Sequence, residues 1–403
     1  MNTQTLYPQS EALHAKESAI AEARPKAATR LLFVDNLRIF LTILVILHHL
    51  MNIYTASGGW IYQEGRQDLV AGVLGKWFTV VNQSYFMGLF MLISAYFVPG
   101  SCDRKGVWRF VKDRLIRLGI PLAVYSWIIR PALIYAALSG FGELNMPIFE
   151  WYTRLYFREY SLIGGGPLWF ISALLIFSIV YAIVRWLSSA RPVKPVVETS
   201  FPSNAAIALF AAMVALVSFL VRFWYPSDRV FAPLAFQFAD FPQYIALFIV
   251  GLVAYRRNWL VHLPEKTGWF WLRIAAILVL LWPPIVIFLG AFENATPFLG
   301  GWHWQALVAA IWQSFLGISM CVTMVHLFQH RLNRQGAFAR FLSRNAYTAY
   351  LIHEAVITFV AVLVMGVMLY PLLKFGLMAL VTIPLIFGLS SLIRKLPLTD
   401  HIL

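Results

Sequence analysis

Charged side chains are scarce in this chain. Asp, Glu, Lys and Arg together make up 12% of its 403 residues, whereas 60% of the residues are hydrophobic. A typical soluble domain carries roughly 25% charged residues. So few charges cannot cover a folded chain of this size in water, whereas a lipid bilayer solvates apolar side chains directly. The composition therefore excludes a soluble globular protein and predicts an integral membrane protein.

Cysteine is rarer still. The two cysteines, Cys102 and Cys321, lie far apart in the sequence, and neither stands in a CxxC or Cys/His motif. This spacing excludes a disulfide framework and indicates no metal site. We therefore predict two inert thiols, with no bound metal and no permanently bound cofactor.

Acidic residues are few compared with basic ones. There are 18 Asp and Glu against 32 Lys and Arg, which gives a formal net charge of +14. In a membrane protein such an excess indicates topology, because cytoplasmic loops collect Lys and Arg, so we predict no nucleic-acid partner. Residues 1–30 are polar and alanine-rich and lack the apolar core of a signal peptide. They are predicted to form a disordered cytoplasmic tail.

Apolar runs of about 20 residues, enough to cross a bilayer, recur along the rest of the chain. Ten such runs lie at about 36–56, 77–98, 115–138, 167–187, 205–225, 234–254, 270–290, 304–328, 346–368 and 371–393. The sequence thus predicts an all-α, polytopic integral membrane protein with about ten transmembrane helices. Residues 31–395 form the transmembrane domain, and residues 396–403 form a short C-terminal tail.

The distribution of positive charge agrees with this partition. With both termini in the cytoplasm, 22 of the 32 Lys and Arg fall in cytoplasmic segments, five in the opposite loops and five within the spans. A miscounted helix would exchange the two sides for every later loop. The bias therefore supports ten spans with both termini cytoplasmic.

The first predicted span carries Arg38 and the pair His48-His49 in an otherwise apolar segment. Ionisable groups inside a membrane are costly, so they indicate function. Eleven helical steps place Arg38 and His49 on one face, about 16 Å apart along the axis. His49 is a candidate general base at the end of a polar track from the cytoplasm, because a neutral imidazole can accept a hydroxyl proton. Alternatively, Arg38 extends to the lipid headgroups and His49 makes a structural hydrogen bond.

A basic cluster precedes the third predicted span. Its members are Arg104, Lys105, Arg109, Lys112, Arg114 and Arg117, against two aspartates. Such a cluster can hold phosphates through charge-assisted hydrogen bonds, although topology and contact with anionic lipids explain it as well. The cluster lies in a predicted loop directly before a Gly-Ile-Pro break, where a ligand tail can enter the membrane. We therefore select Arg104, Lys105, Arg114 and Arg117 as candidate donor-binding residues.

Other polar groups in or near the spans are weaker candidates. Tyr350 and His353 lie one helical turn apart in the ninth span, with Glu354 adjacent, and Arg130 lies beside Pro131 in the third span. Each is a candidate for substrate contact or for a polar tie between helices. The Gly-rich run at 164–167 is predicted as a turn at the membrane boundary. In the first outer loop, Glu64 and Asp68 are candidate acids, for which solvated loop charges are the simpler interpretation.

Several of these motifs form a set. They are Arg38 and His49 with ten residues between them, the Phe90–Ala95 segment, Arg114-x-x-Arg117-x-x-x-Pro121, Gly166-Pro167-Leu168-Trp169-Phe170, and Tyr350-Leu351-Ile352-His353. With this set the chain resembles the membrane acyltransferase-3 family over almost all of its length after the tail. Within the family it looks most like the succinyltransferase-like branch known as glucan biosynthesis protein C.

The chain departs from the family pattern in two places. In the second-helix signature, Met91 replaces an aromatic residue and Ala95 replaces glycine, which leaves Ser94 as the matched polar position. The glutamate that many sugar O-acetylating members carry after the tryptophan is missing, because Leu174 and Leu175 occupy that region.

The resemblance implies an O-acyltransferase of the inner (cytoplasmic) membrane. Such an enzyme moves an acetyl or succinyl group from cytoplasmic acyl-CoA to a hydroxyl of a glycan or another acceptor on the far side. It also implies catalytic roles for His49 and Arg38, with substrate contacts from the basic cluster, Ser94, Tyr350 and His353.

Two other classes remain open from the sequence. A secondary transporter or exporter of an anionic glycan or metabolite also places Arg and His inside the membrane, although no inverted repeat is visible. A lipid-linked-sugar glycosyltransferase would use acidic residues such as Glu64 and Asp68 in the outer loop.

Overall fold

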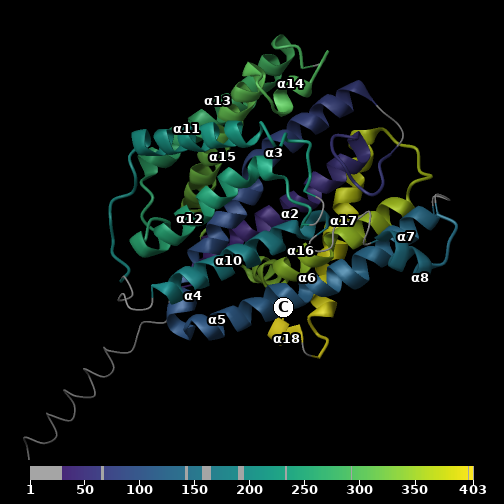
Figure 1. Cartoon of the computed structure of the whole chain (residues 1–403), viewed down its shortest axis with the longest axis horizontal. Helices are drawn as coiled ribbons and strands as arrows, with labels where there is room; N and C mark the ends of the chain where they lie inside the picture. The colour runs from purple at the N-terminus through teal and green to yellow at the C-terminus, as the bar shows by residue number, and fades with distance from the viewer. Residues whose placement is uncertain are drawn as a thin grey trace, which may run out of the picture.

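The computed structural model describes residues 30–64, 68–140, 144–156, 165–188, 195–231, 234–291, 293–397 and 399–402. Regular structure in these residues is helical, apart from one isolated bridge between Phe231 and Phe236. Ten helices in the described residues are long and apolar enough to cross a membrane (Figure 1). The prediction of an all-α, polytopic membrane protein with about ten spans is therefore confirmed. The predicted tail falls almost wholly outside the described residues.

Nine spans are each built on one main helix. These are α2 (Leu32–Thr55), α3 (Leu69–Tyr96), α10 (Trp169–Leu187), α11 (Asn204–Val221), α12 (Phe241–Arg257), α13 (Glu265–Phe288), α15 (Trp304–Arg331), α16 (Ala337–Leu363) and α17 (Pro371–Ile393). The remaining span is composite and runs through α5 (Val107–Arg114), η1 (Leu115–Gly119), α6 (Ile120–Val124), η2 (Tyr125–Ile129) and α7 (Arg130–Gly140). Short helices in the connections are α4 (Val98–Lys105), α8 (Ile148–Trp151), η3 (Tyr152–Tyr156), η4 (Gly166–Leu168), η6 (Phe238–Asp240), α14 (Thr296–Leu299) and α18 (Thr399–Ile402).

The bundle has two distinct ends. One end carries α4, α5, the connection at 332–336 and α18, and we call it the basic end; α5 and α18 lie at the lower edge of Figure 1. The other end carries the connection after α2 and helix α14, which lies near the upper edge, and we call it the outer end. The charge bias of the sequence predicts that the basic end faces the cytoplasm.

Two π turns interrupt the composite span, each just before a proline. Pro121 follows η1 and Pro131 follows η2. Proline has no N–H to donate, so the carbonyl four residues earlier loses its partner. Other helices supply one: Tyr347 Oη donates to the Arg117 carbonyl at 2.5 Å, and Tyr152 Oη donates to the Trp127 carbonyl at 2.8 Å. The predicted Gly-Ile-Pro break is therefore a widened but continuous helix.

Helix α2 lies at the centre of the bundle. It packs against α3, α15, α16 and α17. In its apolar membrane-spanning stretch 72% of the residues are buried, compared with 17% in that of α13. A central, unbroken α2 carries Arg38 near the basic end and His49 nearer the outer end, as the helical spacing predicts.

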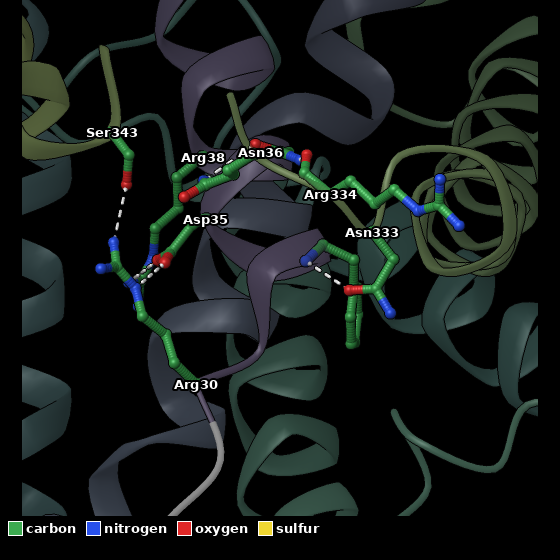
Figure 2. Close-up of polar contacts among 9 residues, drawn as sticks. Arg30, Asp35, Asn36, Arg38, Asn333, Arg334 and Ser343 are labelled. Carbon is green, nitrogen blue, oxygen red and sulfur yellow. Dashed lines mark hydrogen bonds and ion pairs between the residues drawn. The ribbon is translucent and has the colours of Figure 1, made fainter. Parts of the chain in front are cut away.

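The start of α2 is fixed to the connection between α15 and α16. Asn36 donates to the carbonyls of Leu332 and Arg334 at 2.6 and 3.0 Å, and the Phe33 N–H donates to Asn333 at 3.2 Å (Figure 2). The last of these bonds satisfies one of the free N–H groups that every helix leaves in its first turn. These bonds join the basic ends of α2 and α16, which together carry the candidate site.

Candidate functional site

His49 contacts two aromatic rings. The ring centroid of Trp60, in the loop after α2, lies 4.4 Å from that of His49. The ring of His353 on α16 stacks on His49 at 5.4 Å, with its plane only 17° from that of His49. His48 contacts His49 edge-on at 5.4 Å and stacks on Phe86 of α3 at 5.1 Å. We call His48, His49 and His353 the histidine cluster.

The hydrogen bond of His353 fixes its tautomer. Its Nδ1 lies 2.5 Å from the Tyr350 carbonyl oxygen, which can only accept, so Nδ1 carries the proton and Nε2 of the neutral ring offers a lone pair. Among the described residues, His353 Nε2 and the Nδ1 atoms of His48 and His49 are buried with no hydrogen-bond partner. These three nitrogens are therefore available to bond a ligand or a water molecule.

A cavity of about 1190 Å³ extends from the histidine cluster to the outer end. His48, His49 and Tyr350 line its deep part, while Ser57 and Asp228 from outer connections also line it. His49 therefore lies where an acceptor entering from the outer end would meet it.

Tyr350 fixes the Gly-Pro segment against the middle of α16. Its hydroxyl donates to the Pro167 carbonyl at 2.5 Å, and its ring lies 6.0 Å from Phe170 and 6.3 Å from Phe90. The sequence predicts this segment as a turn at the membrane boundary; in the structure its residues 166–168 form η4, directly before α10. A hydrogen bond to the middle of α16, which local sequence does not indicate, holds η4 against that helix.

A buried ion pair adjoins the histidine cluster. Arg130 Nε lies 3.9 Å from Glu354 Oε1, and the two side chains are 12% and 2% exposed. The sequence analysis gives both residues as candidates for a polar contact between helices, and the structure pairs them with each other. Gly165 and Gly166 make room for it: a Cβ atom at Gly166 would lie 2.5 Å from both carboxylate oxygens of Glu354.

We expect Gly166→Ala to destabilise the protein and to lower acyl transfer. Gly166 has φ +61°, a left-handed conformation that costs other residues about 1–2 kcal/mol, and its new methyl group would displace Glu354 beside His353. The midpoint of thermal unfolding in detergent and the transfer rate are measured together. Gly388→Ala is the matched control, because no atom lies within 4 Å of a Cβ there. Equal behaviour of the two variants would contradict this role of Gly166.

Arg38 lies at the basic end, apart from the cavity. Its guanidinium lies 4.9 Å from the Phe97 ring centroid and 3.6 Å from Asp35, which also pairs with Arg30 at 2.6 Å (Figure 2). The lining of the cavity on α2 begins at Val45, and Thr42 is buried before it. The structure therefore places Arg38 and His49 on one helix, with only His49 on the lining of the outer-end cavity.

The basic cluster is helical, contrary to the predicted loop. Residues 98–114 form α4 and α5, which meet at Gly106 with φ +78°. This positive φ allows the sharp turn that continues the chain as helix. Both aspartates of the cluster are paired: Asp113 with Lys105, and Asp103 with Arg256 at 2.6 Å.

The structure brings together only part of the basic cluster. Arg114 lies 5.0 Å from the Phe110 ring and within electrostatic range of Arg117 and Arg38. We call Arg38, Arg114 and Arg117 the arginine group. Arg104 is exposed at the end of α4, and Lys105 is engaged by Asp113.

Ser94 belongs to the basic end. It is half-buried in α3, one turn before Phe97, whose ring Arg38 covers. Ser94 does not line the outer-end cavity described above, which on α3 reaches only to Met87.

The candidate acids of the outer loop hold structural positions. Glu64 Oε1 lies 2.6 Å from Lys374 Nζ, with the two side chains 10% and 2% exposed. Asp68 caps α3 by accepting from the Ala71 N–H at 2.9 Å and also accepts from Tyr370 Oη at 3.2 Å. The expectation of a solvated loop charge is therefore wrong for Glu64, because its side chain is only 10% exposed and forms an ion pair with Lys374 of the last span. Within the described segments, no three His, Cys, Asp or Glu residues group as metal ligands.

The sequence argument misses a polar network on the cavity wall. Arg222 Nη2 lies 3.8 Å from Asp240 Oδ1, and Gln313 bridges the two by accepting from Arg222 and donating to Asp240 at 2.7 Å. Gln83 donates to the other Asp240 oxygen at 3.1 Å. The signal was available, because Arg222 and Asp240 are ionisable residues within predicted spans.

These features define a membrane protein with a polar site of two parts: an arginine group at the basic end, and a histidine cluster beside an outer-end cavity. A family model described as an acyltransferase domain matches residues 31–391, and the chain belongs to this acyltransferase-3 family. It is therefore a multi-pass membrane acyltransferase. Comparison with curated proteins and with solved structures gives no match.

Proposed function

We propose that the protein transfers an acetyl or succinyl group from acyl-CoA in the cytoplasm to a hydroxyl of a glycan on the other side of the inner membrane. One observation carries this proposal. The unbroken helix α2 holds Arg38 at the basic end and His49 on the wall of the outer-end cavity. Donor and acceptor then approach one helix from opposite sides.

The chemistry follows from His49 as general base. His49 takes the proton of the acceptor hydroxyl while its oxygen attacks the thioester carbonyl, which gives a tetrahedral oxyanion. The intermediate collapses to an ester, the C–S bond breaks, and the imidazolium returns the proton to the departing thiolate. The rings of Trp60 and His353 support this role by packing against His49.

The separation along α2 favours a donor-binding role for Arg38. Eleven residues of α-helix span about 16 Å. This distance is too long for the side chains of Arg38 and His49 to touch. In the structure the Arg38 guanidinium lies over the Phe97 ring at the basic end, whereas His49 lines the outer-end cavity. The distance is of the order of an extended pantetheine arm, so the arginine group would hold the phosphates while the thioester reaches His49.

We expect the double variant Arg114→Gln/Arg117→Gln to raise the KM for acyl-CoA by about tenfold, as the loss of charge-assisted phosphate contacts predicts. The effect should shrink as salt rises, because salt weakens the wild-type contacts. Initial rates at several salt concentrations test this. Arg340→Gln, an exposed charge on α16, is the control. An unchanged KM in the double variant would remove Arg114 and Arg117 from the donor site.

The proposed function is tested with purified protein in lipid nanodiscs. Acetyl-CoA and succinyl-CoA are offered with neutral oligosaccharide acceptors, and mass spectrometry follows acyl-CoA loss and ester formation. We expect one donor to be consumed with formation of an O-acyl ester. Transport of oligosaccharide into proteoliposomes lacking acyl-CoA, with no ester formed, would instead favour the transporter class.

A further inference from the structure

The wall of the cavity opposite the histidine cluster carries a connected set of polar side chains. Arg222, Asp240 and Gln313 form the bridged ion pair described above, and Gln83 extends it along α3. All four line the cavity. The side chain of Arg222 is 3% exposed and that of Asp240 is 10% exposed. Such a buried pair is a costly feature of a membrane protein, which indicates a function beyond stability.

The network lies close to the histidine cluster. Gln83 precedes Phe86 by three residues on α3, and Phe86 stacks on His48 at 5.1 Å. Residues three apart lie on one helix face, about 4.5 Å apart along the axis. A ligand that places a hydroxyl at His49 therefore reaches Gln83 and Asp240 with the rest of its body.

The chemistry of the lining fits sugar rings. Tryptophans 77, 169, 282 and 312 line the same cavity. The indole N–H groups of Trp77 and Trp312 already donate to the Val279 and Leu278 carbonyls. Trp312 stacks on Trp282 at 4.0 Å, whereas the half-buried Trp77 ring offers apolar surface to a ligand. Carboxylate, guanidinium and amide groups can donate to or accept from the hydroxyls of that ligand.

The balance of charge favours a neutral ligand over a phosphorylated one. The cavity is lined by the acids Asp68, Asp228 and Asp240 against the bases Lys76 and Arg222. Arg222 is paired with Asp240, so its charge is already compensated. The volume of about 1190 Å³ exceeds the roughly 300–1,000 Å³ of ordinary small-ligand pockets, which fits more than one sugar residue.

We propose that Gln83, Arg222, Asp240 and Gln313 form the acceptor-positioning site and hold a neutral oligosaccharide with one hydroxyl directed at His49. The inference rests on the proposed function, since it supplies the acceptor for that reaction. Gln83 and Gln313 are positioning residues, because they orient the acceptor and Asp240 rather than the reacting atoms.

Binding is tested without catalysis. The His49→Ala protein in nanodiscs is titrated by calorimetry with neutral gluco-oligosaccharides of two to five residues, and with the same oligosaccharides carrying a phosphate. We expect neutral ligands to bind, more tightly with length, and Gln83→Met in this background to weaken their binding by about tenfold, the value of a lost hydrogen bond to a charged partner. Gln313→Met is the second variant, and thermal unfolding checks that both are folded.

Gln329→Met is the matched control, since Gln329 lies on α15 near the basic end and donates to the Val261 carbonyl at 2.6 Å. In the otherwise wild-type enzyme, which retains His49, Gln83→Met should raise the KM for the oligosaccharide and leave the KM for acyl-CoA unchanged. Absence of neutral binding, preference for phosphorylated ligands, or unaltered affinity in both folded variants would overturn the inference. If an O-acyl ester forms on an oligosaccharide while both folded variants bind oligosaccharide as tightly as their parent, the proposed acyl transfer stands and only this site is wrong. If oligosaccharides bind as expected but acyl-CoA is not consumed, this site stands and the proposed acyl transfer is wrong.

Discussion

His49→Ala is expected to bind acyl-CoA with wild-type affinity and to transfer the acyl group about 10³-fold more slowly, within the range that general bases contribute. The binding half follows from the structure, because Arg38 lies eleven residues before His49 on α2, while Arg114 and Arg117 lie on α5 and η1 at the basic end. The transfer half follows because His49 lines the cavity in which we propose that the acceptor binds. Calorimetry with acyl-CoA and single-turnover transfer assays measure the two halves separately.

The neighbouring histidine provides the comparison. His48 is on the same helix and in the same cavity, but it stacks on Phe86, whereas His49 contacts Trp60 and His353. His48→Ala is therefore expected to reduce transfer by about tenfold or less, the cost of a lost packing contact. Added imidazole should partly restore the His49→Ala variant, because alanine leaves a ring-sized space next to Trp60 and His353. Undiminished transfer by His49→Ala would remove His49 from the catalytic role.

The sequence is sufficient for features that depend on local pattern. Ten apolar runs of bilayer length predict ten spans, because a membrane helix satisfies its own backbone hydrogen bonds and needs only length and apolarity. The common face of Arg38 and His49 follows from helical periodicity, since α2 runs unbroken from Leu32 to Thr55. The acyltransferase family was likewise visible in the spacing of these two residues together with the other motifs.

Features that depend on packing between distant segments were not predictable in the same way. The rings around His49 come from the loop after α2 and from α16, about 300 residues further along the chain. The polar network joins α3, the C-terminal end of α11, the start of α12 and α15. Local sequence marks such residues as polar and intramembrane, but the partners of each are set by helix packing, which only the structure gives.

Arg38→Ala is expected to lower kcat/KM for acyl-CoA by about 10²-fold, which corresponds to about 2.7 kcal/mol and to the loss of a charge-assisted contact with a phosphate. The thermal midpoint should not change. Arg38 is 39% exposed, and Asp35 keeps its closer partner Arg30 at 2.6 Å when Arg38 is removed. No buried charge is then left unpaired, so a purely structural explanation predicts almost no effect at this position.

Arg38→Lys separates charge from shape. Lysine keeps the positive charge but loses the planar guanidinium that lies over the Phe97 ring and can bind phosphate through two hydrogen bonds. We expect it to recover part of the activity, so that steady-state kinetics order the variants as wild type, Lys and then Ala. Arg30→Gln is the control, since it removes the other partner of Asp35 without touching Phe97 and should leave acyl-CoA kinetics unchanged. Equal losses in Arg30→Gln and Arg38→Ala would mean that the start of α2, rather than a donor contact, is what both arginines maintain.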